Sequence, residues 1–311
     1  MEERGSSVIY ELTVESAAGQ RIDKYLSEQL ADLSRSYLQK LLKDGGVEVN
    51  GKTVKSNYRL AEGDRICLEV PEAVEPEIEA EPMDLDILYE DKDIILINKP
   101  KGMVVHPAAG HYSGTLVNAL MYHCKDNLSG INGVSRPGIV HRIDMNTTGV
   151  LVTCKNDFAH SRIAAQLAVH DITRKYNAIV WNPFSVESGT VDAPLARSRK
   201  DRKKVAIDQS GRRAVTHYRV LENFKQFAHI ECQLETGRTH QIRVHMSSIG
   251  HPLLGDDVYG SGKSPYNITG QALHARVLGF VHPRTGKYME FEAPLPDYFQ
   301  KILNDLESNG R

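Results

Sequence analysis

The chain of 311 residues is 41% hydrophobic and 25% charged, and its formal net charge is −2. This composition excludes an intrinsically disordered chain, because it supplies enough apolar residues for a hydrophobic core. At roughly 150 residues per domain, the length suggests two globular domains. No apolar run approaches the ~20 residues of a membrane helix, and residues 1–16 lack the apolar stretch of a signal peptide, so a cytoplasmic protein without a membrane span is expected.

The first part of the chain, residues 16–70, predicts a small α/β domain. Apolar side chains follow helical spacing from Ile22 onward, and Ser34 is the expected N-cap of a second helix, 35–43. Val47–Gly51 predicts a strand that enters an Asn-Gly hairpin turn, because these two residue types adopt the positive φ angles of such turns.

Basic residues of this domain are expected to lie near one side of it. They are Arg35, Lys40, Lys43, Lys52 and Lys55. A solvated helix face would give the same pattern, because Lys and Arg are ordinarily exposed. The segments RIDKYL, SR and GVEVNGK together resemble the RNA-binding domain named after ribosomal protein S4. This resemblance implies that the basic side contacts phosphates, and it makes Arg35, Lys40 and Lys52 candidate RNA-binding residues.

An acidic segment follows this domain. Residues 71–82 carry three prolines and five glutamates, which is the composition of an extended, self-repelling linker. The wider segment 71–93 holds ten acidic residues and one lysine, a charge of −9, so subtraction from the net −2 leaves +7 on the rest of the chain. A protein that binds a polyanion can therefore have a net charge near zero.

Residues 83–305 predict a second domain that mixes strands and helices. Asp86–Tyr89 and Ile94–Asn98 predict a hairpin, and the short loops between later strands favour antiparallel pairing. The expected fold is α+β, with this domain built on a mixed, largely antiparallel sheet. Its other predicted strands are Val150–Cys154, Tyr176–Trp181, Ala214–Leu221 and Ala228–Leu234, and its predicted helices are Asp157–Val169, Arg238–Ser248 and Asp297–Leu306.

The four cysteines are far apart and form no C-x-x-C pair. Cys67 and Cys154 lie in apolar runs that predict strands, so both are expected to be buried free thiols. This cysteine usage fits a reducing cytoplasm.

The segment Gly138–Asn156 carries the strongest functional signal. It places Arg142 and Asp144 on a polar turn that leads, at Gly149, into an apolar run. A carboxylate on a turn at the start of a strand can act as an acid, a base or a nucleophile. The same two side chains could also do no more than stabilise the turn and pair with each other.

Four motifs of the second domain occur in the order found in one enzyme family. HRIDMNTTG resembles the H-R-L-D-x-x-T-S-G signature of RluA-type pseudouridine synthases, with Ile143 in place of Leu and Thr148 in place of Ser. RKYNAIV at 174–180 resembles the family's second motif, LETGRTHQIRVHM at 234–246 its third, and NKPKGMVVHP at 98–107 its opening motif.

The resemblance implies an isomerase that acts on uridine in RNA. Such an enzyme breaks the C1′–N1 glycosidic bond, turns the base and rejoins it through C5. Nothing is oxidised and nothing is hydrolysed overall, so the implied reaction requires no cofactor and no metal. The target nucleotide must be flipped out of the RNA stack, which favours a loop over a continuous helix.

The motif positions imply roles for individual residues. Asp144 is the catalytic carboxylate, either as a nucleophile or as a stabiliser of positive charge at C1′. Tyr176 is a candidate general base or a stacking platform for uracil, although a core aromatic in a strand gives the same pattern. Arg243 is the expected ion-pair partner of Asp144, with Ile242 packed nearby. Arg142 is implied to enter the stack that the flipped uridine leaves.

The run RSRKDRKK at 197–204 contains six basic residues in eight. This density is typical of a solvated loop, and it would also attract RNA electrostatically. The candidate RNA-binding residues in this run are Arg199, Lys200, Arg202 and Lys203.

RNA is the expected partner, and large-subunit ribosomal RNA is favoured because an appended domain of this kind is more usual on synthases that act on ribosomal RNA. Transfer RNA is the alternative substrate. A non-catalytic ribosome-assembly factor and a metal-dependent RNA hydrolase are the alternative functions, and replacement of Asp144, Tyr176 or Arg243 would have favoured the former. The chain is expected to act as a monomer.

Overall fold

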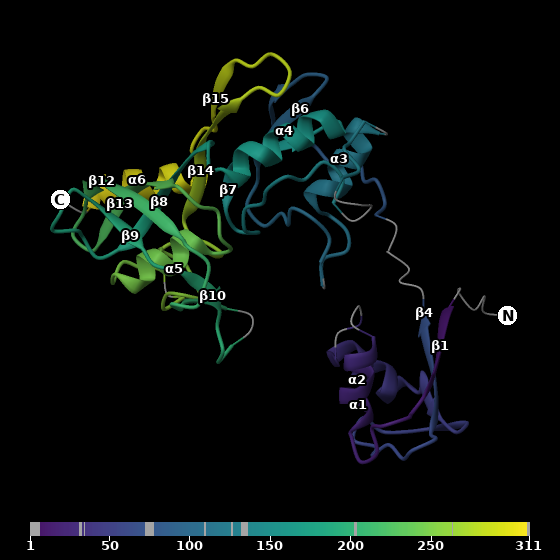
Figure 1. The fold of residues 1–311 in the computed structure, drawn as a ribbon. Coiled ribbons are helices and arrows are strands. Elements are labelled where there is room, and N and C mark those ends of the chain that lie inside the picture. The colour runs from purple at the N-terminus through teal and green to yellow at the C-terminus, as the bar shows by residue number, and fades with distance from the viewer. Residues whose placement is uncertain are drawn as a thin grey trace. The chain divides into compact units, whose positions relative to one another are not determined.

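The computed structural model describes residues 7–30, 33, 35–71, 78–108, 110–125, 127–131, 136–201, 204–262 and 264–309. The chain divides into two compact units, Met1–Glu75 and Pro76–Arg311, and the division falls within the acidic segment. Figure 1 shows the elements of each unit. Among the described residues, no helix has the length and apolar character needed to span a bilayer.

The N-terminal unit is a four-stranded antiparallel sheet with two helices. The strand order is β1-β4-β2-β3. Its elements are β1 (Ser7–Thr13), α1 (Ile22–Gln29), α2 (Arg35–Asp44), β2 (Val47–Val49), β3 (Lys52–Thr53) and β4 (Arg65–Pro71). The predicted Asn-Gly turn is confirmed, because Asn50 and Gly51 both have positive φ between β2 and β3. The expected N-cap, Ser34, lies outside the described residues.

One strand of this unit contradicts a prediction made from its apolar character. Cys67 lies on β4 but is exposed, because side chains alternate along a strand and its neighbours Ile66 and Leu68 take the buried positions. Cys154 is buried, as predicted.

The C-terminal unit is built on a nine-stranded sheet. The order is β5-β6-β7-β14-β8-β13-β12-β9, with β15 also paired to β14. Every neighbouring pair is antiparallel except β7 and β14, which are parallel, so the predicted mixed, largely antiparallel sheet is confirmed. The strands are β5 (Ile87–Glu90), β6 (Ile94–Lys99), β7 (Thr148–Cys154), β8 (Thr173–Trp181), β9 (Ser188–Asp192), β12 (Val215–Asn223), β13 (Phe227–Leu234), β14 (Leu273–Val281) and β15 (Tyr288–Glu292).

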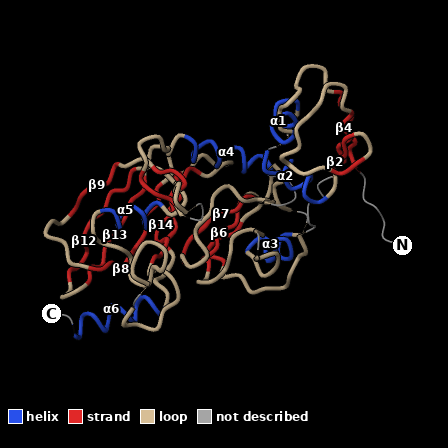
Figure 2. Tube along the Cα trace, turned by 90° about the horizontal axis from the view of Figure 1, so that it is seen from below, coloured by secondary structure: helices blue, strands red, loops and turns tan. Residues whose placement is uncertain are grey.

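Helices cover both faces of this sheet (Figures 1 and 2). They are α3 (Leu116–Cys124), α4 (Asp157–Ala168), α5 (Gln241–Ser248) and α6 (Asp297–Asn309). Side chains of α3 and α5 share one hydrophobic cluster with Leu151 and Ala178. On the opposite face α4 packs with Val150 and Val152, and α6 packs with Ile179. This alternation along β7 and β8 places Tyr176 on the same face as α5.

The end of the predicted linker is tied to the C-terminal unit. Ile78 is buried in the cluster that includes α3. The Asn118 side chain donates to the carbonyl oxygen of Glu79 at 2.8 Å, and the backbone N–H of Gly114 donates to the carboxylate of Glu81. Residues 78–82 are therefore part of this unit's surface rather than a free spacer.

Candidate active site

The turn that carries Asp144 is held from below by a buried lysine. Lys99, at the end of β6, is fully buried, and its Nζ donates to the carbonyl oxygens of Pro100, Met103 and Met145 at 2.8 to 3.0 Å. Three carbonyls match the three N–H donors of an ammonium group. Burial lowers the pKa of Lys99 to about 7. Because Met145 follows Asp144 directly, Lys99 fixes the backbone from which the carboxylate projects.

The strand after the turn depends on a glycine. Gly149 has φ of 108° and lies on β7, where this strand pairs in parallel with β14. A Cβ atom at this position would come within 2.2 Å of the carbonyl oxygen of Ala275. Only glycine therefore lets β14 approach β7 this closely, and this approach brings Leu273 of β14 to the site.

Asp144 shares a guanidinium with a second carboxylate. Nη1 of Arg243 donates to Oδ2 of Asp144 at 3.0 Å, while Nε and Nη2 donate to both oxygens of Asp256 at 2.7 and 2.9 Å. Burial works against the charge of Arg243, but its bonds to the two carboxylates outweigh burial and raise its pKa. Burial likewise opposes ionisation of Asp256, and Arg243 lowers the pKa of that carboxyl. Arg243 is thus locked in one position.

The helix that carries Arg243 is shorter than predicted. It begins at Gln241 rather than at Arg238, because His240 adopts the left-handed conformation with φ of 56°, which an α-helix cannot contain. The Gln241 side chain accepts hydrogen bonds from the N–H of Arg238 and the hydroxyl of Thr236, so these turn groups are satisfied without a helix.

This turn brings His240 to Asp144. Nε2 of His240 lies 3.8 Å from Oδ1 of Asp144, and Nδ1 lies 2.7 Å from the hydroxyl of Tyr259. Burial lowers the pKa of His240. The Tyr259 oxygen accepts a hydrogen bond from the N–H of Val205, so its own proton is free for Nδ1. A neutral ring with Nδ1 as acceptor carries its proton on Nε2, which faces Asp144.

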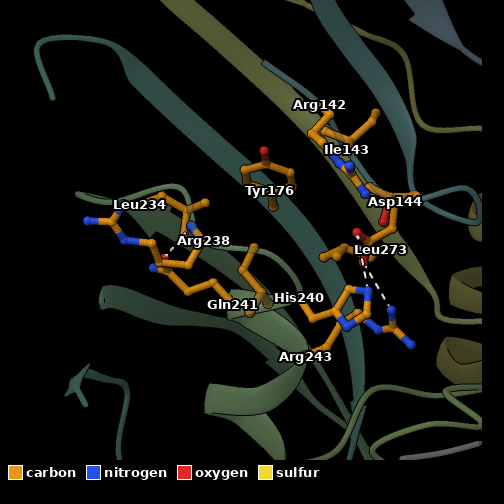
Figure 3. A pocket seen from close by; sticks show the side chains of 12 residues that line it. Arg142, Ile143, Asp144, Tyr176, Leu234, Arg238, His240, Gln241, Arg243 and Leu273 are labelled. Atoms are coloured by element: carbon orange, nitrogen blue, oxygen red, sulfur yellow. Dashed lines mark hydrogen bonds and ion pairs between the residues drawn. The ribbon is translucent and has the colours of Figure 1, made fainter. Parts of the chain in front are cut away.

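These residues surround a small cleft. Tyr176 and Ile242 are buried in its walls, and Arg142 is exposed at its rim. Figure 3 shows the contacts of His240 and Arg243 with Asp144 in this cleft. The structure thus brings together the five residues that were predicted for catalysis and base flipping.

The remaining predicted residues lie elsewhere on the chain. Nη2 of Arg35 pairs at 2.9 Å with Asp23, which is fully buried. Lys40 and Lys52 are exposed in the N-terminal unit. The basic run joins β10 (Leu195–Arg197) to β11 (Val205–Ile207), and Lys200 is exposed there, while Arg199 is 3.4 Å from Asp208. Arg202 and Lys203 lie outside the described residues.

Lys99, His240 and Asp256 contact the turn or the ion pair of Asp144 and were not among the predicted site residues. Lys99 and His240 lie inside motifs recognised from the sequence, NKPKGMVVHP and LETGRTHQIRVHM, so a closer study of their polar residues could have suggested them. Asp256 follows a glycine in a loop and gives no such signal. Its proximity to Arg243 arises only from the fold.

Two groups of described residues bring potential metal ligands close together, and neither lines the cleft. They are Glu90, His123 and Cys124, and Asp91, Asp93 and His282. In the first group Lys155 pairs with Glu90 and supplies the positive charge that a metal ion would bring. Burial raises the pKa of the Cys124 thiol to about 11. In the second group Arg284 pairs with Asp93. Cations of the protein itself thus already pair with carboxylates of both groups.

Comparison with known proteins gives two family matches. Residues 93–248 match the family described as RNA pseudouridylate synthase, and residues 20–66 match the S4 domain. A protein of Bacillus subtilis named "Uncharacterized RNA pseudouridine synthase YlyB" is 55% identical over 95% of this chain and 97% of its own length. The "Ribosomal large subunit pseudouridine synthase D" of Zymomonas mobilis is 48% identical over 96% of this chain and 97% of its own length.

Solved structures of similar fold are also known. Human RNA Pseudouridylate Synthase Domain Containing 4 has a TM-score of 0.57 and 26% identity, and the match covers 71% of this chain and 92% of that one. Human RNA Pseudouridylate Synthase Domain Containing 1 has the same TM-score at 22% identity, over 74% of this chain and 98% of that one.

Proposed function

The chain belongs to the RNA pseudouridylate synthase family and isomerises uridine in RNA, and we propose that Asp144, Arg243 and Tyr176 carry out this reaction in the cleft described above. The observation that carries the proposal is the ion pair between Asp144 and a guanidinium that a second carboxylate holds in place. The reaction is balanced within one nucleotide: the C1′–N1 bond breaks, a C1′–C5 bond forms, C5 loses a proton and N1 gains one.

Asp144 acts at the sugar in this proposal. Its Oδ2 is engaged by Arg243, whereas Oδ1 has His240 at 3.8 Å, beyond hydrogen-bond distance. Oδ1 is therefore the oxygen available to the substrate. It either bonds to C1′ as a nucleophile or stabilises the positive charge that develops there when the C1′–N1 bond breaks.

Arg243 and Asp256 supply a fixed electrostatic frame for this step. A guanidinium with two carboxylates and little solvent keeps its geometry while charge moves at the substrate, so no reorganisation is needed during the reaction. Nε2 of His240 faces Oδ1 of Asp144 from 3.8 Å, which is too far for a hydrogen bond. We assign His240 an electrostatic role beside the carboxylate, because its partner Tyr259 fixes the ring.

Tyr176 serves as a surface for the uracil ring rather than as a base. Burial raises the pKa of its phenol above the ordinary value of 10, so the phenolate is scarce at neutral pH. A neutral phenol ring in the cleft wall can stack on the base while it turns. Ile242 provides an apolar contact in the same cleft, and the exposed Arg142 is placed at the rim, where it can fill the stack that the flipped nucleotide leaves.

RNA binding extends beyond the cleft. The N-terminal S4 domain binds RNA, and we assign phosphate contacts to its exposed Lys40 and Lys52. Arg35 contributes the exposed half of its side chain while Asp23 holds its position. The hairpin with Arg199 and Lys200 adds a further basic surface, and its run continues through Arg202 and Lys203.

Large-subunit ribosomal RNA is the proposed substrate. The support is the name of relatives at 42–48% identity, which describes them as ribosomal large subunit pseudouridine synthases, together with the S4 domain. We also propose that the protein acts as a monomer, and that it acts in the cytoplasm, where free thiols such as its four cysteines persist.

Tritium release from C5-labelled uridine tests this proposal. Transcripts of large-subunit ribosomal RNA and of transfer RNA are each incubated with the wild type, Asp144→Asn and Asp171→Asn, which neutralises an exposed carboxylate elsewhere. We expect release from the ribosomal transcript, unchanged in Asp171→Asn and reduced more than about 1,000-fold in Asp144→Asn. Release from transfer RNA alone would refute the substrate assignment, and full activity of Asp144→Asn would refute the catalytic one.

A further inference from the structure

A second pocket adjoins the cleft and shares six lining residues with it, among them Arg142, Asp144 and Arg238. We call it the basic pocket, because Arg142, Arg174 and Arg238 line it and Asp144 is the one carboxylate among its described lining residues. That carboxylate is already paired with Arg243. The basic pocket therefore carries positive charge in excess.

Arg174 is the unusual residue of this pocket. It lies on β8, two residues before Tyr176, and only 6% of its surface is exposed. Its Nη2 donates to the carbonyl oxygen of Glu235 at 3.0 Å, while its buried Nε has no partner and no described carboxylate pairs with it. Burial lowers the pKa of Arg174. Buried cations in proteins are ordinarily paired, because removing them from water is costly.

The loop around Arg174 holds its guanidinium in place. Gly237 passes so close that a Cβ atom there would lie 2.5 Å from Nη1 of Arg174. With the carbonyl of Glu235 on Nη2, the loop fixes the guanidinium on one side and leaves the other side toward the pocket. The site is thus built around an arginine rather than filled by a mobile one.

His141 adds a neutral donor to the same pocket. Its Nε2 accepts a hydrogen bond from the N–H of Val152 at 3.1 Å. Burial, with a contribution from the charge of Arg174, lowers the pKa of His141 to about 4, so the ring is neutral at pH 7. A neutral imidazole that accepts at Nε2 carries its proton on Nδ1, for which no described residue is a partner.

We propose that Arg174, together with Arg238 and the Nδ1–H of His141, binds a backbone phosphate that flanks the flipped uridine. A guanidinium with free N–H donors matches the oxygens of a phosphate, and an anion would compensate the buried charge that the protein leaves unpaired. The inference rests on the proposed function, because the phosphate is placed by the uridine whose sugar lies at Asp144. The contact positions the nucleotide, so Arg174 is a binding residue and not a catalytic one.

The test uses a synthetic RNA stem-loop around a uridine that the wild type isomerises, with single phosphates replaced by neutral methylphosphonates. For the wild type we expect one flanking replacement to weaken binding about 10- to 100-fold, the usual effect of losing a hydrogen bond to a charged group. Arg174→Met should bind the unmodified RNA equally weakly and be insensitive to that replacement.

Controls separate the possible failures. Arg219→Met removes an exposed strand arginine that pairs with Glu231, and it should keep wild-type affinity and sensitivity. Wild-type binding that is unaffected by every flanking methylphosphonate would overturn the inference without requiring any variant to fold. The inference would also be overturned if the replacement weakened RNA binding by Arg174→Met as much as it weakens binding by the wild type. If Arg174→Met lost only the stabilisation against unfolding that inorganic phosphate gives, and kept its RNA affinity, the pocket would be a free-anion site. The inference would again be wrong. Loss of isomerisation by wild type would refute the proposed function instead.

Discussion

Two buried arginines line the adjoining pockets that contain Asp144, and they differ in the charge that surrounds them. Arg243 on α5 makes three hydrogen bonds to the carboxylates of Asp144 and Asp256. Arg174 on β8 donates to one backbone carbonyl and pairs with no described carboxylate. Their exposed fractions are almost the same, 5% and 6%. The two side chains are therefore buried to nearly the same extent, yet only the charge of Arg243 is compensated by described carboxylates.

The difference shows which charges belong to the fold and which wait for a ligand. A buried pair such as Arg243 and Asp256 has its desolvation offset within the free protein, so breaking it should harm folding and chemistry together. A buried charge without a partner reduces the stability of the free protein, and a ligand of opposite charge offsets that cost on binding. Removing Arg243 should consequently lower the free energy of unfolding, whereas removing Arg174 should leave it unchanged or raise it.

Removing Arg243 should give the largest effect. In Arg243→Met two carboxylates remain near each other without a cation, so we expect single-turnover tritium release to fall more than about 1,000-fold. The free energy of unfolding should fall by about 3–5 kcal/mol, as for other broken buried pairs. Urea unfolding of the free protein and tritium release measure the two effects.

A double variant separates the effect of Arg243 on folding stability from its effect on catalysis. Arg243→Met with Asp256→Asn no longer has the second uncompensated carboxylate, so it should recover much of the lost stability but none of the lost activity. Recovery of activity would mean that Arg243 serves the fold alone.

Removing only the second carboxylate should have an intermediate effect. In Asp256→Asn the guanidinium keeps Asp144 but loses its charged anchor, and a misplacement of about 1 Å can cost roughly 100-fold in rate. We expect kcat to fall far more than KM rises. Equal kinetics of the variant and the wild type would show that Asp144 and the helix suffice to hold Arg243.

The stability effect of Asp256→Asn should depend on pH. Burial raises the pKa of Asp256, but the hydrogen bonds and charge of Arg243 outweigh it, so the folded-state pKa lies below the unfolded value of 3.8. The unfolded chain therefore binds the proton first as pH falls, and the stabilisation is present above pH 3.8 and lost below it. Urea unfolding at pH 7 and pH 3.5 should show a smaller difference between variant and wild type at the lower pH.

The sequence predicted those parts of the site that lie within recognisable motifs. Asp144, Tyr176 and Arg243 each lie inside a segment whose residue pattern is distinctive, and the strands β7 and β8 follow from apolar runs. The turn before α5 was missed because His240 in the left-handed conformation breaks a pattern that looks helical. Local spacing cannot show a single residue with positive φ when that residue is not glycine.

The long-range parts of the site could not be predicted in the same way. The central strand β14 was not recognised, because His274, Arg276 and Gly279 interrupt its apolar pattern; in the fold, His274 bonds to Thr148 and β7 pairs beside it. Asp256 lies 13 positions from Arg243 in the chain, and only the packing of its loop brings the carboxylate to the guanidinium. The exposure of Cys67 likewise depends on which face of its strand is covered.

Exposed cations form a third class in this comparison, because they are not buried and do not pair with buried carboxylates. Replacing Arg199 and Lys200 by glutamine removes two charges from the hairpin, and each RNA phosphate that these side chains no longer neutralise should reduce the slope of log K against log salt by about 0.7–0.9. We expect weaker RNA binding at low salt and unchanged folding stability, because solvent already hydrates these side chains. RNA titrations at several salt concentrations measure this, and an unchanged slope would remove the hairpin from the RNA-binding surface.

The smallest expected effect is the change in the free energy of unfolding that Arg174→Met causes in the absence of RNA. Methionine fills similar space, carries no charge and leaves only the Glu235 carbonyl without its donor, so removing the unpaired cation should leave stability unchanged or raise it by about 1 kcal/mol. Arg174→Lys keeps the charge and should gain nothing. Urea unfolding of Arg174→Met, Arg174→Lys and Arg243→Met compares the two arginines directly. If Arg174→Met lost as much stability as Arg243→Met, Arg174 would be a part of the fold, and the unpaired charge would have no role reserved for RNA.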